Sequence, residues 1–306
     1  MNNIIIEKEK IVHNINTIKS CIQDDNKSCK IIAILKANAY GVGYNVMAPI
    51  LLENGIDMFG VTSVSEALEL KKYTNGKDIL VMNSTSIPEE VDLIVKNGFI
   101  ASIGSFESLE ILEKMSKESS IQTRYHINID TGMCRFGFRA NDILSSSDEN
   151  SLLNNIVTAI NESANIKLAG IYTHFRQSYE KSSEKTKEQF DLFINVINRF
   201  RKKEIDVGLK HCANTSAFFK YPYMHLDAVR VGSALVGRVQ PGITDKLQRV
   251  GYLESTICEI RNLKAGDKVF YSGMFEAKTD MKVAVVEAGY KDGFRIVWSK
   301  RQYEII

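Results

Sequence analysis

The sequence predicts an α/β protein: a (β/α)8 barrel of the TIM type over residues 1–237, followed by a smaller, incomplete, mainly β domain over residues 238–306. Three observations lead to this prediction. The 306 residues exceed one ordinary domain. Eight short β-rich runs alternate with stretches of helical periodicity from residue 9 to about residue 235, which is the order of elements in a barrel. Beyond Gly237 the β-like runs continue with no long helix between them.

The predicted barrel strands are short runs rich in aliphatic, β-branched and aromatic residues. The first of them, residues 30–35, is a nearly continuous apolar run, which is typical of a strand buried on both faces. The eight runs are residues 30–35, 58–61, 78–82, 99–103, 123–129, 167–173, 207–211 and 226–229.

Helices are predicted between most of these strands from the spacing of apolar residues and from capping residues at their ends. They cover residues 45–54, 63 or 65 to about 75, 88–96, 106–116, 151–162 and 184–203. Segment 214–225 is too short for a full helix, so the seventh crossover has the least support. Eight strands with intervening helices favour a closed parallel barrel over an open sheet.

The mainly β domain is predicted from three β-like runs, residues 250–260, 267–271 and 282–287. Turn residues separate them at 264–266 and 272–273. The change in character places the domain boundary near residue 238.

The composition excludes several classes of protein. Hydrophobic residues make up 44% and charged residues 25%, and 39 basic against 37 acidic residues form no basic stripe, so nucleic acid is not an expected partner. The five cysteines are scattered without a CxxC pair, which favours reduced thiols over disulfides and predicts no metal site. No apolar run reaches a membrane span or a signal-peptide core, so we expect a cytoplasmic protein without a membrane partner.

Chemically distinctive residues follow the predicted strands at their carboxyl ends, where barrel enzymes place their sites. Lys36 ends the apolar first strand, so we expect its amine to be partly desolvated, with a lowered pKa that favours attack on an aldehyde. Arg135 lies in a loop that contains Gly132 and Gly137, and its guanidinium fork suits a carboxylate or phenolate. His174 follows the sixth strand and can stack on a flat ring. Each also has a plain interpretation: a lysine or an arginine in solvent, and a hydrogen-bonded core histidine.

The last two strands end in small polar residues. Asn214, Thr215 and Ser216 follow the seventh strand, and hydroxyls and loop amides at this place are the usual phosphate cradle of the barrel. Arg230 and Gly232 add a cation and a glycine at the eighth. The alternative for the polar residues after the seventh strand is an ordinary turn, and the alternative for Arg230 is a salt bridge. Taken together, these strand ends describe a pocket with an amine, two arginines, a ring to stack and a phosphate cradle.

These strings resemble the motifs of the alanine racemase family, in family order from residue 33 to residue 294. KANAYGVG from Lys36 resembles its pyridoxal-phosphate (PLP) lysine signature, and DTGMCRFGF from Asp130 its arginine loop. GIYTHF, HCANTSA and VRVGS resemble its stacking histidine, its phosphate-binding turn and its arginine-and-phosphate turn. GYKDG from Gly289 resembles the motif that carries its second base.

The resemblance implies a two-base amino-acid racemase that is a homodimer with shared active sites. Lys36 would form the Schiff base with PLP and act as the base on one face of the substrate, and Tyr290 of a partner subunit would act on the other face. Alanine is the expected substrate, for cell-wall peptidoglycan, with serine or a broader range as alternatives. Two bases on opposite faces suit a reaction that removes the α-proton from one side and returns one to the other.

The resemblance also assigns the remaining site residues. Arg135 would bind the substrate carboxylate and the PLP phenolate oxygen. His174 would lie against the pyridine ring, and Arg230 would hydrogen-bond its nitrogen and keep it unprotonated, which discourages transamination. The residues that would bind the cofactor around its phosphate are Tyr40, Asn214, Thr215, Gly232 and Ser233.

Two departures from the family pattern stand out. Asn128 occupies a place where the family often has a carbamylated lysine, and asparagine cannot carry a carbamate, so Arg135 must be oriented by other means, such as a bound anion. Only 16 residues follow Tyr290, so we expect a truncated or shortened β domain with impaired activity. The alternatives are a non-catalytic PLP-binding barrel, or another PLP enzyme of this fold such as a decarboxylase or D-amino-acid aldolase. The GYKDG motif and Arg230 argue against the latter.

Overall fold

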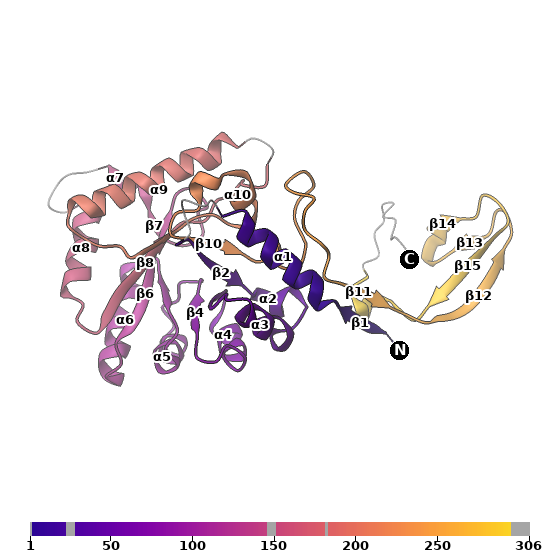
Figure 1. Cartoon of the computed structure of the whole chain (residues 1–306), viewed down its shortest axis with the longest axis horizontal. Coiled ribbons are helices and arrows are strands. Elements are labelled where there is room, and N and C mark those ends of the chain that lie inside the picture. Colours follow the sequence, from indigo (N-terminus) through magenta and orange to yellow (C-terminus); the bar gives the residue numbers. More distant parts are fainter. Residues whose placement is uncertain (1, 23–27, 146–150, 181–182, 295–306) are drawn as a thin grey trace. The chain divides into compact units, whose positions relative to one another are not determined.

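A computed structural model of the chain describes residues 2–22, 28–145, 151–180 and 183–294 (Figure 1). The chain divides into two compact units. One unit comprises Lys8–Val250, and the other combines the residues before Lys8 with those after Val250. Among the described residues, no helix is both long enough and apolar enough to cross a membrane.

The larger unit is built on eight parallel strands, which confirms the predicted strand count and fold class. They are β2 (Lys30–Ile34), β3 (Met58–Val61), β4 (Asp78–Val81), β5 (Ala101–Ile103), β6 (Thr123–Asp130), β8 (Ile166–Tyr172), β9 (Leu209–His211) and β10 (Ala228–Val231). Their order in the sheet is β4-β3-β2-β10-β9-β8-β6-β5. A parallel bridge between Leu80 and Ile100 joins the two ends of this order, so the barrel is nearly closed.

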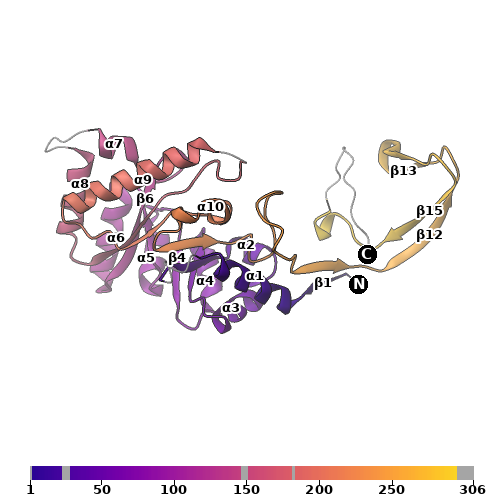
Figure 2. The ribbon, with the colours of Figure 1, turned by 45° about the horizontal axis from the view of Figure 1, so that its top comes forward.

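Helices cover the outside of these strands, as Figures 1 and 2 show. They are α1 (Lys8–Ser20), α3 (Tyr44–Glu53), α4 (Val64–Lys71), α5 (Pro88–Asn97), α6 (Phe106–Ser119), α7 (Ala140–Leu144), α8 (Leu152–Glu162) and α9 (Glu184–Lys202). The predicted helices agree with α3 to α6, α8 and α9, whereas α1, α7 and the two-residue strand β7 (Phe138–Arg139) were not predicted. The seventh crossover holds only α10 (Thr215–Lys220) and a 3-10 turn at Pro222–Met224, so the expected lack of a full helix is confirmed.

Apolar side chains from several strands fill the barrel interior. Such filling makes a (β/α)8 barrel a packed core and not a pore, and leaves the site to the loops at the strand ends. One buried cluster joins residues from β2, β3, β4, β10 and the bridge residue: Ile32, Ile34, Met58, Leu80, Ile100 and Ala228.

Local backbone features correct the predicted start of the last strand. The sequence predicts a strand at residues 226–229, but β10 begins at Ala228. Leu226 has a left-handed φ of 51°, and the carboxylate of Asp227 accepts hydrogen bonds from the backbone N–H and the Nζ of Lys210. A turn therefore occupies the first two predicted residues.

The smaller unit consists of three antiparallel strand pairs, which confirms its mainly β character. β1 (Asn3–Ile6) pairs with β11 (Gly251–Glu254), β12 (Ile257–Leu263) with β15 (Met281–Val286), and β13 (Lys268–Val269) with β14 (Phe275–Glu276). The sequence did not predict β1, and the run at 267–271 is shorter than predicted because Phe270 adopts a φ of 71°. The domain boundary near residue 238 stays a prediction.

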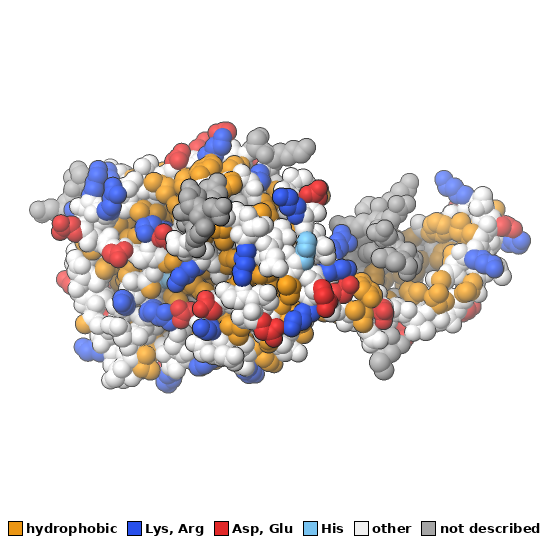
Figure 3. All heavy atoms as spheres, viewed as in Figure 1, with side chains coloured by type: hydrophobic (Ala, Val, Ile, Leu, Met, Phe, Trp, Pro, Cys, Tyr) orange, Lys and Arg blue, Asp and Glu red, His pale blue; other side chains and the backbone are white. Residues whose placement is uncertain are grey.

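The surfaces of the two units differ in the side chains that they expose. On the face drawn in Figure 3, basic and acidic side chains are interspersed over the barrel unit. The β unit exposes large apolar side chains, among them Ile257, Ile260, Phe270, Tyr271 and Phe275. The described part of this unit therefore does not bury all of its large apolar side chains.

Candidate active site

Lys36 begins a turn of left-handed helix directly after β2. The segment α2 (Lys36–Tyr40) has φ/ψ of 52°/50° at Ala37, 51°/53° at Asn38 and 55°/48° at Ala39, and φ is 56° at Tyr40. These are left-handed helical values, which cost residues other than glycine roughly 1–2 kcal/mol each. Lys36 itself is exposed, so the expectation that burial desolvates its amine is wrong.

The predicted phosphate residues of three segments lie together. The backbone N–H of Ser233 donates to the Tyr40 hydroxyl, and the N–H of Gly232 donates to Oγ1 of Thr215 over 3.3 Å. A Cβ on Gly232 would overlap the Tyr40 hydroxyl, so a larger residue here would have to displace the phenol. Burial and the charge of Glu66 raise the pKa of Tyr40 to about 12, partly offset by the Ser233 N–H. The phenol is therefore a neutral hydrogen-bond donor at neutral pH.

Asn214 shapes this cradle as the cap of α10. Its Oδ1 accepts hydrogen bonds from the N–H of Ala217 at 3.1 Å and from the hydroxyl of Ser178 at 2.9 Å. Lys220, at the other end of α10, donates to the backbone carbonyls of Ser178 and Glu180. These contacts fasten α10 to the loop after β8 and so fix the position of Thr215.

Arg230 is buried at the carboxyl end of β10, with four of its five N–H groups bonded to the protein. One terminal nitrogen donates to Nδ1 and to the carbonyl of His211 at 2.8 and 3.0 Å, and the other donates to the carbonyls of Thr173 and Cys212 at 2.8 and 3.1 Å. A guanidinium has five donors, so the Nε–H remains without an acceptor among the described residues. The alternative of a salt bridge is not found, because Asp227 pairs with Lys210 instead. Burial lowers the pKa of Arg230 to about 10, so it stays charged at neutral pH.

Two buried histidines that the sequence analysis did not assign hold Arg230 in place. Because a guanidinium only donates, Nδ1 of His211 is the acceptor and its proton lies on Nε2. That nitrogen donates to Nδ1 of His126 at 2.9 Å. The His211 ring also stacks on Tyr172, with centroids 5.0 Å apart, and the Arg230 guanidinium lies 5.4 Å from the same ring. Burial lowers the pKa of both histidines, that of His126 to about 3, so both are neutral.

The charges of all three predicted cations act on His174. Burial first, and then the charges of Arg230, Arg135 and Lys36, lower the pKa of His174 to about 3. No carboxylate is among the groups that act on its titration. Its Nδ1 is buried without a hydrogen-bond partner among the described residues. The three cations predicted on separate strand ends thus act on one place that lacks a compensating negative charge.

Arg135 is carried by a tightly folded loop between β6 and β7. Oδ1 of Asp130 accepts hydrogen bonds from the N–H groups of Gly132 and Cys134 at 2.9 and 3.0 Å. Gly137 has a φ of 114°, and a Cβ there would lie 2.8 Å from the backbone of Asn128 and Asp130. Asn128 is buried in β6, beneath this loop. The orientation of Arg135 by a bound anion stays a prediction.

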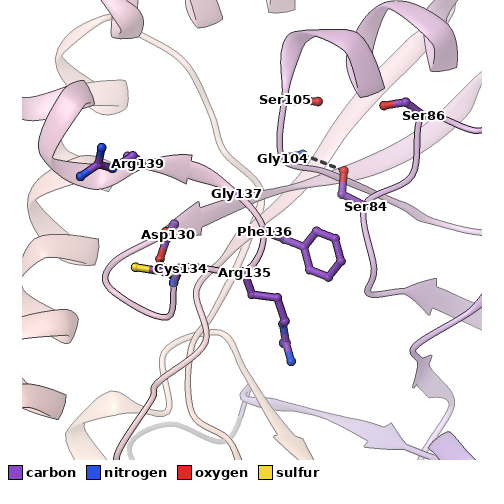
Figure 4. A pocket seen from close by; sticks show the side chains of 10 residues that line it. All are labelled: Ser84, Ser86, Gly104, Ser105, Asp130, Cys134, Arg135, Phe136, Gly137 and Arg139. Atoms are coloured by element: carbon purple, nitrogen blue, oxygen red, sulfur yellow. Dashed lines mark hydrogen bonds between the residues drawn. The ribbon is translucent and has the colours of Figure 1, made fainter.

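The loop places Arg135 against a cavity of about 550 Å³ (Figure 4). The far wall is formed by the ends of β4 and β5, where the N–H of Gly104 donates to Oγ of Ser84 at 3.2 Å. Arg135 is exposed, and its closest cation–π partner is the neighbouring Phe136, at 5.8 Å. It forms no ion pair with any described residue, so its guanidinium is available for a ligand.

A buried polar chain joins the Arg135 loop to the His174 loop. The hydroxyls of Thr131 and Thr173 are 2.8 Å apart, and the Nε2 of Gln189 on α9 donates to Thr131 over 3.2 Å. Oε1 of Gln189 accepts from the N–H of Arg176 at 3.1 Å. These hydrogen bonds could not be predicted from the sequence, because a lone glutamine on an amphipathic helix has no distinguishing pattern.

Tyr290 belongs to the other unit, where GYKDG folds into a 3-10 turn over Tyr290–Asp292. The carboxylate of Asp292 accepts from the N–H of Gly289 at 2.9 Å, and Gly293 closes the turn with a φ of 89°. The Tyr290 side chain is 58% exposed. The motif therefore presents the phenol on the surface of its own unit.

The family matches cover both units. The family model of the alanine racemase N-terminal domain matches residues 6–240, and that of the alanine racemase C-terminal domain matches residues 250–306. Alanine racemase 1 of Clostridium acetobutylicum is 32% identical over 305 residues, which cover 98% of this chain and 75% of that protein. The alanine racemase of Methanococcus maripaludis is 32% identical over 283 residues, which cover 91% of this chain and 73% of that protein.

Solved structures give the same result. An alanine racemase of Clostridium difficile superposes with a TM-score of 0.82 at 27% identity, over 95% of this chain and 73% of that one. The alanine racemase of Bacillus anthracis with bound L-Ala-P superposes with a TM-score of 0.80 at 26% identity, over the same shares of the two chains. With a family model matched over most of its length, the chain belongs to the alanine racemase family.

Proposed function

We propose that the chain is a PLP-dependent racemase that interconverts L- and D-alanine and supplies D-alanine for peptidoglycan in the cytoplasm. The observation that carries the proposal is the cradle of hydroxyls and loop amides where Tyr40, Thr215 and Ser233 meet, together with the charges of Lys36, Arg135 and Arg230 that act on His174. A site whose positive charges are not compensated, next to a phosphate cradle, suits two anionic ligands: a phosphorylated cofactor and an amino acid with its carboxylate. Serine or a broader range of amino acids is the second substrate class.

The residues present fit PLP on three counts. The buried Nδ1 of His174 lacks a partner, which suits a site completed by a ligand or a second chain. Because Gly232 has no Cβ, the Tyr40 hydroxyl can lie close to its backbone in the cradle. The free Nε–H of Arg230 is a charged donor that suits a ring nitrogen. Tyr40, Thr215, Gly232 and Ser233 would hold the phosphate, and Asn214 would set the position of Thr215.

When bound, PLP supplies an aldehyde that condenses with amines and a ring that withdraws electrons from the α-carbon. The side chains determine what is done with that reactivity. The amine of Lys36 removes or returns the α-proton on one face, and the phenol of Tyr290 from a partner subunit does so on the other. Arg135 orients the substrate carboxylate through its guanidinium fork. Arg230, charged and held by four hydrogen bonds, opposes protonation of the ring nitrogen and so favours racemisation over transamination.

The function is tested by incubating the chain with PLP and following the conversion of L-alanine to D-alanine, with L-serine and other amino acids in parallel. Reduction with borohydride should add the mass of PLP to the peptide that contains Lys36. Lys36→Ala should abolish both signals, whereas the same change at Lys30, one strand length earlier, should leave both. Labelling of any lysine other than Lys36 would contradict the assignment.

A further inference from the structure

Glu66, on the helix that follows β3, connects the left-handed turn to a second strand end. We propose that Glu66 is a positioning residue that fixes the backbone from which Lys36 reaches the cofactor. The inference rests on the proposed function of Lys36. None of the five residues of this turn is glycine. Residues other than glycine avoid a left-handed backbone, so contacts with the rest of the barrel must hold the turn in it.

Both carboxylate oxygens of Glu66 are used, each toward a different strand end. Oε1 accepts a hydrogen bond from the N–H of Ala37 over 2.6 Å, immediately after Lys36. Oε2 accepts from the N–H and the hydroxyl of Thr62, each over 2.8 Å, at the end of β3. Because β2 and β3 are neighbours in the barrel, one side chain ties the start of the left-handed turn to the next strand.

Apart from the Tyr40 hydroxyl, which accepts from the N–H of Ser233, the other hydrogen bonds of the turn among the described residues run within the segment or its immediate continuation. The N–H of Ala39 donates to the carbonyl of Leu35 over 2.9 Å, and that of Gly41 donates to the carbonyl of Ala37 over 3.0 Å. Oδ1 of Asn38 accepts from the N–H of Tyr44 over 3.0 Å, which fixes the exit into α3. The Ala37 N–H is thus the point where the entry of the turn is tied to another part of the barrel.

The sequence alone suggests a simpler role for Glu66. Ser63 and Glu66 have the spacing of a capping box, in which the glutamate serves the first turn of its own helix. Ser63 does cap α4, since its hydroxyl accepts from the N–H of Glu66 over 3.3 Å. The bond to Ala37, however, crosses 29 positions of the chain to a separate element, which a helix cap alone does not require.

Glu66 is well suited to this role because it stays ionised. Burial alone would raise its pKa, but the donors from Ala37, Thr62 and Ser63 outweigh burial and lower it. A carboxylate offers acceptors on both oxygens, whereas glutamine offers one acceptor and turns an N–H group toward a donor. Glu66→Gln therefore keeps the size of the side chain and loses the hydrogen bonds on one side, either to Ala37 or to Thr62.

The test compares Glu66→Gln with Glu69→Gln. Glu69 lies on the same helix, is exposed and pairs with Lys72, so it serves as the matched control. In the chain without PLP, amide exchange of the peptide spanning residues 34–43 should accelerate about tenfold in Glu66→Gln and remain unchanged in Glu69→Gln. With PLP added, the rate of borohydride-trapped labelling at Lys36 should fall about tenfold in Glu66→Gln alone.

A second change separates positioning from general stability. In the Glu66→Gln background, Ala37→Gly should recover much of the labelling rate, because glycine takes a left-handed backbone without the steric cost that the tie offsets. A role confined to capping α4 predicts no rescue. Circular dichroism and the melting temperature of each variant confirm that the fold is retained in those compared.

The outcomes are distinguishable. If wild type labels at Lys36 and Glu66→Gln matches it in both exchange and labelling, Glu66 is not a positioning residue and the proposed function stands. If exchange accelerates but labelling does not slow, the turn is held by Glu66 but Lys36 does not depend on it, which also overturns the inference. If wild type fails to label at Lys36, the proposed function falls, and the inference with it.

Discussion

At the scale of single residues, the site combines cations with histidines that are neutral at neutral pH. His126 and His211 are buried, and the hydrogen bonds from Arg230 through His211 to His126 use neutral rings. A proton added to either ring would be opposed by burial and by the charge of Arg230, which outweigh the opposite effect of Asp78 on His126. The neutral state of this pair is therefore part of what keeps Arg230 oriented.

This arrangement predicts that acid destabilises the barrel unit. The folded pKa of His126 is about 3, well below its ordinary value, and that of His211 is lowered in the same direction, so the unfolded chain binds protons first. The contribution of His126 to stability is complete above about pH 6.5 and is lost as the pH falls toward 3, by roughly 1.4 kcal/mol per pH unit, and that of His211 is lost in the same direction. Urea unfolding between pH 8 and pH 5 measures this loss.

A comparison of two histidines tests the origin of that loss. His126→Asn should reduce the slope below pH 6.5. His13→Gln is the control and should leave it unchanged, because His13 is exposed and among the described residues bonds the carbonyl of Lys246 and the hydroxyl of Thr17. If the free energy of unfolding does not change between pH 7.5 and pH 5, His126 and His211 are protonated in the folded chain without loss of stability, and the prediction is wrong.

The lysine turn shows where residue-level prediction from sequence ends. The position of Lys36, Arg135, His174 and Arg230 at strand ends, together with the family motifs around them, led to their prediction as site residues. The left-handed backbone of Ala37–Ala39 could not be predicted, since alanine avoids that conformation and no glycine marks it. Glu66 was missed for a related reason: its partner at Ala37 is distant in the chain and close only after folding.

At the scale of elements, periodicity predicted which segments are strands and helices better than where they end. The ends are set by contacts that the local pattern does not contain. β10 starts late because Asp227 binds Lys210 across to the neighbouring strand, and β13 stops early at Phe270. β1 was missed because its four residues pair with a strand at the far end of the chain.

The loop after β6 gives a prediction at this scale. Gly137→Ala should destabilise the chain by about 2–4 kcal/mol, because it combines a positive φ with overlap against the backbone of Asn128 and Asp130. Gly98→Ala is the matched control: its φ is 68° but a Cβ would meet nothing within 4 Å, so about 1 kcal/mol is expected. Urea unfolding measures both changes.

The same pair of variants tests what the loop does for the site. Since Gly137 is two residues after Arg135, the change should also raise the KM for alanine, whereas Gly98→Ala should leave KM unaltered. Equal effects of the two variants on stability and KM would mean that the tight loop is not what positions Arg135.

At the scale of the whole molecule, the two candidate bases belong to different compact units. Lys36 lies in the barrel unit and Tyr290 on the surface of the β unit. The sequence predicted both units from the loss of helices after residue 237. It could not predict that the first residues of the chain belong to the second unit, because strand pairing over such a separation leaves no local pattern.

The proposed sharing of sites between subunits predicts complementation. Lys36→Ala and Tyr290→Phe chains should each be inactive, and an equal mixture that exchanges subunits should recover roughly a quarter of wild-type activity, since half of the dimers hold one site with both bases. The assay is racemisation of L-alanine after mixing. Mixing Lys36→Ala with a chain that carries both changes is the control and should recover nothing. Mixed dimers without activity would rule out the shared site.

The pairing of β1 with β11 has a consequence for the order of events during synthesis. Asn3 meets Glu254, and the side chain of Asn2 bonds the carbonyl of Glu287 at 3.3 Å, the hydroxyl of Ser255 at 2.8 Å and the carboxyl of Asp292. At 5–20 residues per second, Asn2 and Asn3 wait roughly 10–50 s on the ribosome for these partners. The barrel can fold in that interval, but the turn that carries Tyr290 is fastened to Asn2 only after Asp292 has been synthesised.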